Sequence, residues 1–214
     1  MRRVNLTLYF VTDSTGRSES EFLETVRGAC EGGVTLVQLR EKEKSGLAYL
    51  RLAEKVKQIT DAHDIPLIID DRADIALAAD AAGVHVGQSD LPVYAARRLL
   101  GGHKIVGATA KTVPQALAAR EQGADYLGVG AIYPTTTKVV TVITAVSTLN
   151  EIAAQTGLPV AAIGGLNASN LHALYGSRAG GIAVVSAIMN SADPRETASA
   201  LKRQVLENFG RAGL

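Results

Sequence analysis

The chain has 214 residues but only one cysteine, Cys30, and it has no long hydrophobic run. A single cysteine excludes a disulfide framework and a cysteine-rich metal site, and it is typical of a reducing compartment. No apolar run approaches the ~18 residues of a membrane-spanning helix, and polar residues interrupt the N-terminal segment too often for a signal peptide. These absences predict a cytoplasmic protein without membrane attachment.

An excess of one charge is lacking as well. The 22 Lys and Arg residues nearly balance the 21 Asp and Glu residues, which leaves a formal net charge of +1. Without an excess basic field, the chain is not expected to bind nucleic acid, because nothing would hold the phosphate backbone. Apolar residues, by contrast, make up 47% of the chain, too many for a disordered protein. A chain of this length and composition predicts one domain with a sizeable core.

Eight short, mostly apolar segments recur along the chain and are typical of parallel strands covered on both sides. They span residues 8–12, 35–40, 66–70, 83–86, 104–108, 126–130, 159–163 and 181–185. Helical spacing fills the intervals, as in Phe22, Val26 and Ala29, and Asp193-Pro194 is typical of a helix start. Glycine pairs or singles at 32–33, 83, 123 and 180–181 predict left-handed ends of helices.

This alternation predicts a single-domain (β/α)8 TIM barrel over residues 1–214, with its core at about 8–209. A doubly wound open sheet is the second interpretation. In a (β/α)8 barrel, chemistry takes place at the C-terminal ends of the strands, and three groups of polar residues follow the expected strands here.

The first group is a pair of carboxylates. Asp71 and Asp90 follow neighbouring strands, so they could converge on one cation. Two carboxylates without a His or Cys cluster favour Mg²⁺, which takes a few protein oxygens together with water and substrate phosphates. The alternative is that each Asp caps the helix that follows it.

The second group consists of cations and hydroxyls suited to a diphosphate. The cations are Arg40, Lys42 and Lys138, and the hydroxyls are those of Thr109, Thr135 and Thr137. Arginine supplies a planar fork and lysine a point charge for phosphate oxygens. The alternative is that residues 40–44 form an ordinary solvated run of charges, which spacing alone favours.

The third group is a glycine turn. Gly164-Gly165 and Val185-Ser186 follow the last two expected strands, where barrels often hold a phosphate with backbone N–H groups. Glycine lets the backbone come close to an anion, although a tight turn alone would also need it.

Six motifs in order give the chain a resemblance to the thiamine-phosphate synthase family. They are residues 38–42 (QLREK), 70–72 (DDR), 85–90 (HVGQSD), 134–138 (PTTTK), 162–165 (AIGG) and 181–186 (GIAVVS). The resemblance implies a (β/α)8 barrel that joins 4-amino-5-hydroxymethyl-2-methylpyrimidine diphosphate to a thiazole phosphate. Diphosphate and thiamine phosphate would be the products. It implies small-molecule substrates and a Mg²⁺ cofactor, and it is compatible with a homo-oligomer.

The resemblance also implies roles for individual positions. It assigns Mg²⁺ binding to Asp71 and Asp90, and catalytic roles to Arg40, Lys42, Thr109 and Lys138. The substrates would be held by these last four together with Gln38, Leu39, Glu41, Asp70, Thr135, Thr136, Thr137, Gly165, Val185 and Ser186. Asp70 stands where many members have Asn, Thr109 where Ser is common and Lys111 where His is frequent. Residues 139–148 lack the Gly-Leu pair usual in the family.

Two other functions compete with the synthase. A thiazole tautomerase, a related barrel, would need the phosphate site but not the diphosphate cations, so Asp71, Asp90 and Lys138 speak against it. A non-catalytic barrel that binds thiamine phosphates would have little use for a carboxylate pair. In the synthase, the implied step is dissociative, with a carbocation-like pyrimidine and no protein nucleophile. His63, His85, His103 and His172 have no metal-ligand spacing and are predicted to be structural or surface residues.

Overall fold

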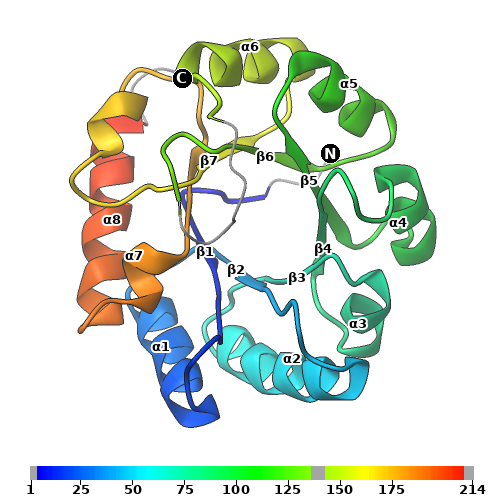
Figure 1. Ribbon diagram of the computed structural model, residues 1–214, viewed down its shortest axis with the longest axis vertical. Helices are drawn as coiled ribbons and strands as arrows, with labels where there is room; N and C mark the ends of the chain where they lie inside the picture. Colours follow the sequence, from blue (N-terminus) through cyan, green and yellow to red (C-terminus); the bar gives the residue numbers. More distant parts are fainter. Residues whose placement is uncertain (1–3, 136–142, 210–214) are drawn as a thin grey trace.

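The computed structural model describes residues 4–135 and 143–209, and these form a closed barrel of eight parallel strands (Figure 1). The strands pair in sequence order and β1 closes onto β8. Their bounds are β1 Leu8–Val11, β2 Leu36–Leu39, β3 Leu67–Asp70, β4 Gly83–Val86, β5 Ile105–Ala110, β6 Tyr126–Gly130, β7 Val160–Ile163 and β8 Gly181–Val184. The predicted (β/α)8 barrel is therefore confirmed, and each strand falls within one residue or two of its predicted segment.

Helices cover the outside of the barrel (Figure 1). They are α1 Glu19–Glu31, α2 Gly46–Asp61, α3 Ala73–Ala78, α4 Val93–Leu100, α5 Val113–Glu121, α6 Val146–Thr156, α7 Ser186–Met189 and α8 Pro194–Phe209. The described connection between β7 and β8 carries only a 3₁₀ helix, η1 Leu171–Leu174. The long α8 packs against α1 and completes the ring. No helix of the described chain is long and apolar enough to cross a membrane.

Side chains alternate between two cores along every strand. In β1, Leu8 and Phe10 belong to the core between barrel and helices, whereas Tyr9 and Val11 point into the barrel. The inner core is the smaller one and also contains Leu36, Ile68, Ile105, Tyr126, Ala161 and Ala183. This period of two follows from strand geometry and decides which polar residues can reach the barrel interior.

Two of the four predicted glycine helix ends are correct and two are wrong. Gly33 and Gly123 follow α1 and α5 with φ of 90° and 96°, the left-handed conformation that glycine adopts without strain. Gly83 and Gly181 instead begin strands, where a Cβ would lie 2.0 Å from Ile105 O and 1.8 Å from Leu6 O. Glycine is needed there because the neighbouring backbone comes too close for any side chain.

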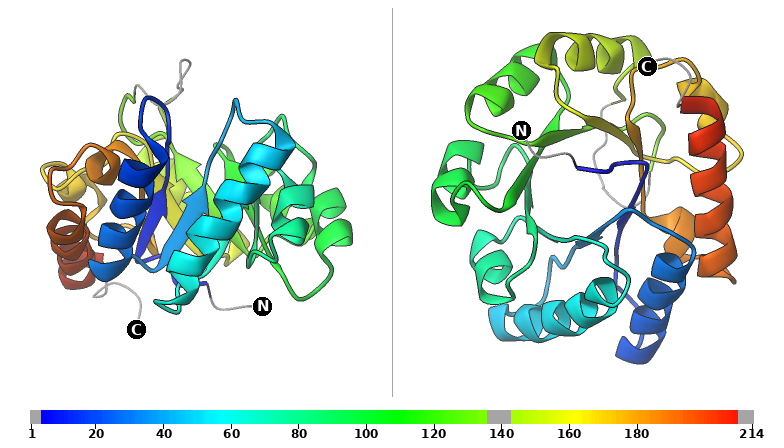
Figure 2. Two further views of the ribbon diagram at one scale, coloured as in Figure 1. Left: turned by 90° about the horizontal axis from the view of Figure 1, so that it is seen from below. Right: turned by 180° about the vertical axis from the view of Figure 1, so that it is seen from behind.

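The loops that lead from each strand into the following helix lie at one end of the barrel (Figure 2). Asp193 accepts a hydrogen bond from Glu196 N at 2.9 Å, which confirms the predicted start of α8. Ser18 and Glu21 cap α1 reciprocally. The loops after β1 and β2 rise at the same end.

Candidate active site

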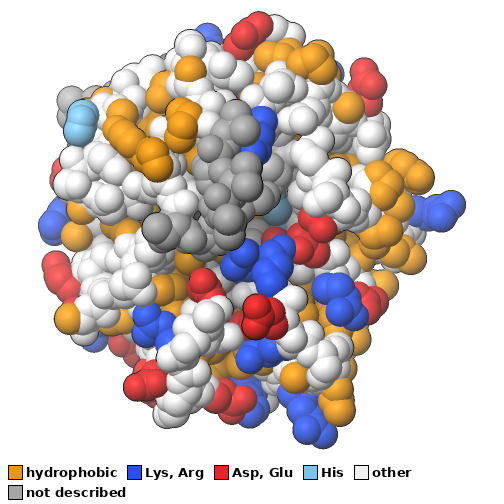
Figure 3. Space-filling model, viewed as in Figure 1, with side chains coloured by type: hydrophobic (Ala, Val, Ile, Leu, Met, Phe, Trp, Pro, Cys, Tyr) orange, Lys and Arg blue, Asp and Glu red, His pale blue; other side chains and the backbone are white. Residues whose placement is uncertain are grey.

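A cavity of about 200 Å³ opens at the C-terminal ends of the strands. Its lining comes from all eight strands or the loops after them. The predicted site residues that line it are Gln38, Arg40, Lys42, Asp70, Asp71, Thr109, Thr135, Gly165, Val185 and Ser186. Charged side chains gather near the middle of this face of the molecule (Figure 3). The barrel therefore brings together, around one cavity, residues that are far apart in the sequence.

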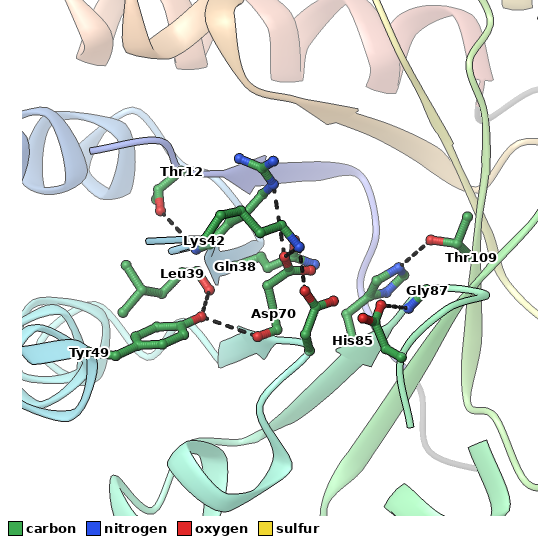
Figure 4. A network of polar contacts seen from close by, with 12 residues as sticks. Thr12, Gln38, Leu39, Lys42, Tyr49, Asp70, His85, Gly87 and Thr109 are labelled. Atoms are coloured by element: carbon green, nitrogen blue, oxygen red, sulfur yellow. Dashed lines mark hydrogen bonds and ion pairs between the residues drawn. The ribbon is translucent and has the colours of Figure 1, made fainter. Parts of the chain in front are cut away.

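Two carboxylates face each other at one side of this cavity. Asp71 follows β3 with φ of 60°, a left-handed conformation that is strained for a residue with a side chain. Asp90 lies in the loop after β4 and accepts a hydrogen bond from Gly87 N at 2.8 Å (Figure 4). Burial, and then contact with Asp71, raise the pKa of the Asp90 carboxyl. Two carboxyl groups in contact repel each other when ionised, so a cation between them would be stabilised.

The structure excludes helix capping as the role of these two residues. The first residue before α3 is Arg72 and the first before α4 is Pro92, and neither helix start has a side-chain cap. Asp71 and Asp90 are thus held by the loops themselves. Within residues 4–135 and 143–209, no group of three His, Cys, Asp or Glu residues could hold a metal. A pair of carboxylates with room for water and phosphate oxygens fits the few protein ligands that Mg²⁺ takes.

Cations from the loop after β2 reach Asp71 and its neighbour Asp70. Lys42 Nζ forms an ion pair with Asp71 and lies 2.8 Å from Asp70 Oδ2, and Arg40 Nε lies 3.8 Å from the same oxygen (Figure 4). Burial opposes the charge of Lys42, but the two carboxylates together raise its pKa, so it stays charged. The Asp70 side chain is buried, which raises its pKa, and the cations offset this in part. The negative charge of Asp70 is therefore compensated in part by Lys42 and Arg40 within the site.

The contacts of residues 40–42 distinguish this segment from an ordinary solvated run of charges. Arg40 and Lys42 line the cavity, while the Glu41 side chain is only 6% exposed and accepts a hydrogen bond from Ser14 Oγ at 2.7 Å. Glu41 Oε1 is buried without a hydrogen-bond partner in the described part of the chain. Burial raises the pKa of Glu41.

A glycine turn forms the opposite side of the cavity. Gly164 and Gly165 have φ of 102° and 65°, and a Cβ on Gly165 would lie 2.6 Å from Pro134 O. Val185 and Ser186 join β8 to α7 beside this turn and line the same cavity. Both close packing and left-handed backbone therefore require glycine here. The turn presents backbone rather than side chains to the cavity, as an anion site needs.

Some predicted residues lie elsewhere. The Leu39 side chain is fully buried in the core between barrel and helices, and neither Leu39 nor Glu41 is among the described residues that line the cavity. Contact with a bound substrate would have to come from their backbone. Thr136, Thr137 and Lys138 lie outside the described residues, as do residues 139–142 of the divergent segment 139–148.

Three residues that the sequence analysis did not place in the site lie at the bottom of the cavity. Tyr9 and His85 line it, and Tyr126 lies beneath them, fully buried. The His85 Nδ1 atom lies 3.1 Å from Tyr126 OH, and its Nε2 atom 2.9 Å from Thr109 Oγ1. The alternation of apolar and polar residues in 83–86 could have indicated that His85 points inward, because Val84 and Val86 take the outward positions.

Burial of His85 predicts a pH dependence of stability. Burial is the main cause that lowers the pKa of His85 from 6.5 to about 4. Between these pH values the unfolded chain binds a proton that the folded chain does not. The contribution of neutral His85 to the free energy of unfolding is therefore fully present above pH 6.5 and is lost as the pH drops toward 4. The loss attributable to His85 is about 3 kcal/mol, since each pKa unit corresponds to about 1.4 kcal/mol.

Urea unfolding of the wild type and of His85→Gln, measured at several pH values between 4 and 7, tests this. We expect the free energy of unfolding of the wild type to fall more steeply with acid than that of the variant. Other carboxyl groups titrate in both proteins and cancel in the comparison. Equal slopes would show that His85 is protonated as easily in the folded as in the unfolded chain.

A closed parallel barrel with facing carboxylates, adjacent cations and a glycine turn at the C-terminal ends of its strands defines a class of barrel enzymes that handle phosphorylated substrates. Residues 8–188 match the family model for thiamine monophosphate synthase. The chain belongs to this family. The predicted family and fold are thereby confirmed, together with the predicted class of enzyme, a transferase.

Individual relatives agree with the family model. "Thiamine-phosphate synthase 2" of Streptococcus pneumoniae is 52% identical over 193 residues, which cover 90% of this chain and 92% of the relative. The thiamine-phosphate synthase of Enterococcus faecalis is 51% identical and covers 94% of this chain and 95% of the relative. The solved thiamine phosphate pyrophosphorylase of Pyrococcus furiosus superposes with a TM-score of 0.85 at 36% identity, covering 95% of this chain and 97% of that one.

Proposed function

We propose that the chain joins the pyrimidine diphosphate to the thiazole phosphate to make thiamine phosphate and diphosphate. The observation that supports this proposal is that two different groups of residues suited to anions lie around one cavity. One side has the carboxylate pair with Arg40 and Lys42, and the other has the Gly164-Gly165 turn. A reaction between two phosphorylated substrates needs such a pair of sites, placed so that the reacting atoms meet between them.

The first site suits the leaving diphosphate. Arg40 and Lys42 would bind its oxygens, and Asp71 and Asp90 are the residues that would hold Mg²⁺. When bound there, Mg²⁺ would neutralise the negative charge that develops on the diphosphate. Lys42 forms ion pairs with Asp70 and Asp71, so diphosphate would have to draw it from these carboxylates. Lys138 is the third cation proposed for this substrate.

The bond changes follow from charge. As the C–O bond breaks, its electron pair leaves with the diphosphate, and the aminopyrimidine ring takes up the positive charge left on the methylene carbon. The thiazole nitrogen then attacks this carbon with its lone pair. No protein nucleophile is needed, and Cys30, the sole cysteine, is buried away from the cavity with its pKa raised by burial. The role of the chain is to position both substrates and to stabilise the leaving group.

The second site suits the thiazole phosphate. The backbone of Gly165, together with Val185 and Ser186, would hold the phosphate, and Thr135 and Thr137 are the residues proposed to contact the thiazole. Gln38, Asp70 and Thr109 line the same cavity and would hold the pyrimidine. Thr136, Leu39 and Glu41 complete the proposed substrate contacts, the last two through their backbone.

Incubation of the purified protein with both substrates, with and without Mg²⁺, tests the proposal directly. We expect thiamine phosphate by mass spectrometry and an equal amount of diphosphate, both only when Mg²⁺ is present. An isomerised thiazole carboxylate phosphate in place of these products would indicate a tautomerase. Binding of the thiazole phosphate without any turnover would indicate a binding protein, and either result would contradict the proposal.

A further inference from the structure

A chain of hydrogen-bonded side chains crosses the bottom of the cavity. Gln38 Nε2 donates to Tyr9 OH at 2.5 Å, and the Tyr9 and Tyr126 hydroxyls are 2.7 Å apart. His85 continues the chain, with Nδ1 3.1 Å from Tyr126 OH and Nε2 2.9 Å from Thr109 Oγ1. Its members come from five strands, β2, β1, β6, β4 and β5 in that order. Figure 4 shows its last step, in which His85 faces Thr109.

Glycines in the neighbouring strands leave room for this chain of hydrogen-bonded side chains. Gly107 pairs in register with His85 on one side and Tyr126 on the other, so it lies directly between them. A Cβ on Gly107 would lie 2.2 Å from Cζ of the Tyr126 ring, and one on Gly128 would lie 3.3 Å from His85 Cε1. Both glycines have ordinary strand conformations, so no turn requires them. Space for the two rings is their evident purpose.

The number of protons in this chain of hydrogen bonds is fixed because its titratable side chains stay neutral. Burial raises the pKa of the Tyr9 and Tyr126 hydroxyls far above pH 7. Burial also lowers the pKa of His85 to about 4. Each tyrosine therefore has one proton to donate, and the His85 ring carries one proton on one of its two nitrogens.

These counts determine a direction. The Gln38 amide nitrogen can only donate, so the Tyr9 proton must go onward to the Tyr126 oxygen. The Tyr126 proton then goes to Nδ1 of His85, whose own proton is left on Nε2. Nε2 donates to Thr109 Oγ1, and the Thr109 proton must find another acceptor.

We infer that this chain of hydrogen bonds is polarised from Gln38 to Thr109 and makes the Thr109 hydroxyl a hydrogen-bond donor toward the cavity. Tyr9, Tyr126 and His85 are then positioning residues. Thr109 lines the cavity, and the described residues offer its hydroxyl no hydrogen-bond partner other than the donor His85 Nε2. Cooperative polarisation along the chain would strengthen the bond that Thr109 donates.

This direction selects the ligand. A donor hydroxyl at the bottom of the cavity favours a group with a lone pair, such as an unprotonated ring nitrogen, and disfavours a ring N–H or C–H at the same point. An aminopyrimidine has such nitrogens, and this part of the inference rests on the proposed function. The direction of the hydrogen-bonded chain does not, because it follows from contacts within the protein alone.

NMR of the histidine ring nitrogens tests the direction. In protein labelled with ¹⁵N-histidine, the His85 signals are assigned by their loss in His85→Gln, and the pattern of ring couplings shows which nitrogen carries the proton. We expect Nε2–H in the wild type. Gln38→Glu, studied at alkaline pH, places an ionised carboxylate that can only accept beside Tyr9. It should reverse the chain and move the His85 proton to Nδ1.

The double variant Gln38→Glu/Tyr126→Phe is the decisive control. Without the Tyr126 oxygen, the change at Gln38 is not connected to His85, so we expect the proton to return to Nε2. A merely structural role would not couple these two positions through the tautomer of a third residue. Nδ1–H in the wild type, or no movement of the proton in Gln38→Glu, would overturn the inference.

Steady-state kinetics test the consequence for the ligand. Tyr126 lies outside the cavity lining, so Tyr126→Phe acts on the cavity only through its hydrogen-bond partners His85 and Tyr9. We expect the KM for the pyrimidine diphosphate to rise about fivefold, the effect of one weakened hydrogen bond, with the KM for the thiazole phosphate unchanged. Thr156→Val removes another buried hydroxyl, bonded to Ile152 O in α6 outside the cavity lining, and should change neither.

The two kinds of failure are distinguishable. If the protein made no thiamine phosphate, the proposed function would fail while the NMR result still decided the direction of the chain. If thiamine phosphate formed but Tyr126→Phe left the KM for the pyrimidine diphosphate unchanged, the selection of the ligand through Thr109 would be refuted.

Discussion

Asp90→Ala is expected to lower turnover about a thousand-fold while leaving the barrel folded. Asp71 lines the cavity, Asp90 is in contact with Asp71, and neither carboxylate caps a helix. Loss of one of two metal ligands removes several kcal/mol of stabilisation from the leaving diphosphate, and about 4 kcal/mol corresponds to this loss of rate. The fold should tolerate the change because Asp90 lies in a loop and is not part of either core.

Two further variants separate the charge of Asp90 from its hydrogen bond. Asp90→Asn keeps an oxygen that can accept from Gly87 N but has no negative charge, so its activity should be nearly as low as that of Asp90→Ala. Asp74→Ala removes an exposed carboxylate that pairs with Arg72 one helical turn from the site, and it should remain active. The measurements are the rate of diphosphate release over a range of Mg²⁺ concentrations and the melting temperature. Near-normal activity of Asp90→Ala at limiting Mg²⁺ would remove Asp90 from the metal site.

The barrel could be predicted from the sequence because its signals are local and repeated. Each strand is short and apolar, as in 67–70 and 126–130, and each lies between segments of helical spacing. The prediction of helix ends at Gly83 and Gly181 failed for a physical reason. A glycine required by the approach of a neighbouring strand has the same sequence appearance as one required by a helix end, and only the closed sheet distinguishes them.

The site was predicted by its residue types more accurately than by the directions of its side chains. Gln38 and Leu39 are consecutive in β2, so they must point to opposite sides of the sheet, and Leu39 therefore belongs to the outer core. Applying the same period of two to Tyr9, His85 and Tyr126 would have placed all three inside the barrel. Polar and aromatic residues at inward positions of a mostly apolar barrel are the signal that was available.

Other features depend on tertiary structure alone. That Glu41 turns toward Ser14 while Lys42 turns into the cavity depends on how the loops after β1 and β2 pack. The balance of Asp70 by Lys42 and Arg40 likewise depends on the register between β2 and β3. Loop conformations of this kind are set by contacts between segments distant in sequence, and no local pattern encodes them.

Gly165→Ala should damage the thiazole phosphate site selectively. A Cβ at this position would lie 2.6 Å from Pro134 O and 2.7 Å from Tyr133 Cβ, so the turn and the segment after β6 must move apart. We expect the KM for the thiazole phosphate to rise by roughly a hundred-fold, because the backbone N–H groups of the turn would lose their alignment, at about 1.4 kcal/mol for each factor of ten. The KM for the pyrimidine diphosphate should change little, since its proposed site lies on the other side of the cavity.

A matched control is present in the same chain. Gly176 has φ of 73°, close to the 65° of Gly165, but a Cβ there would meet nothing within 4 Å. Gly176→Ala therefore introduces the same left-handed strain, about 1–2 kcal/mol of stability, without the collision. We expect both variants to lose stability because of the left-handed strain that they share. Only Gly165→Ala should lose affinity for the thiazole phosphate. Equal KM values for the two would show that the turn does not bind the phosphate, because conformational strain alone would then account for the glycine.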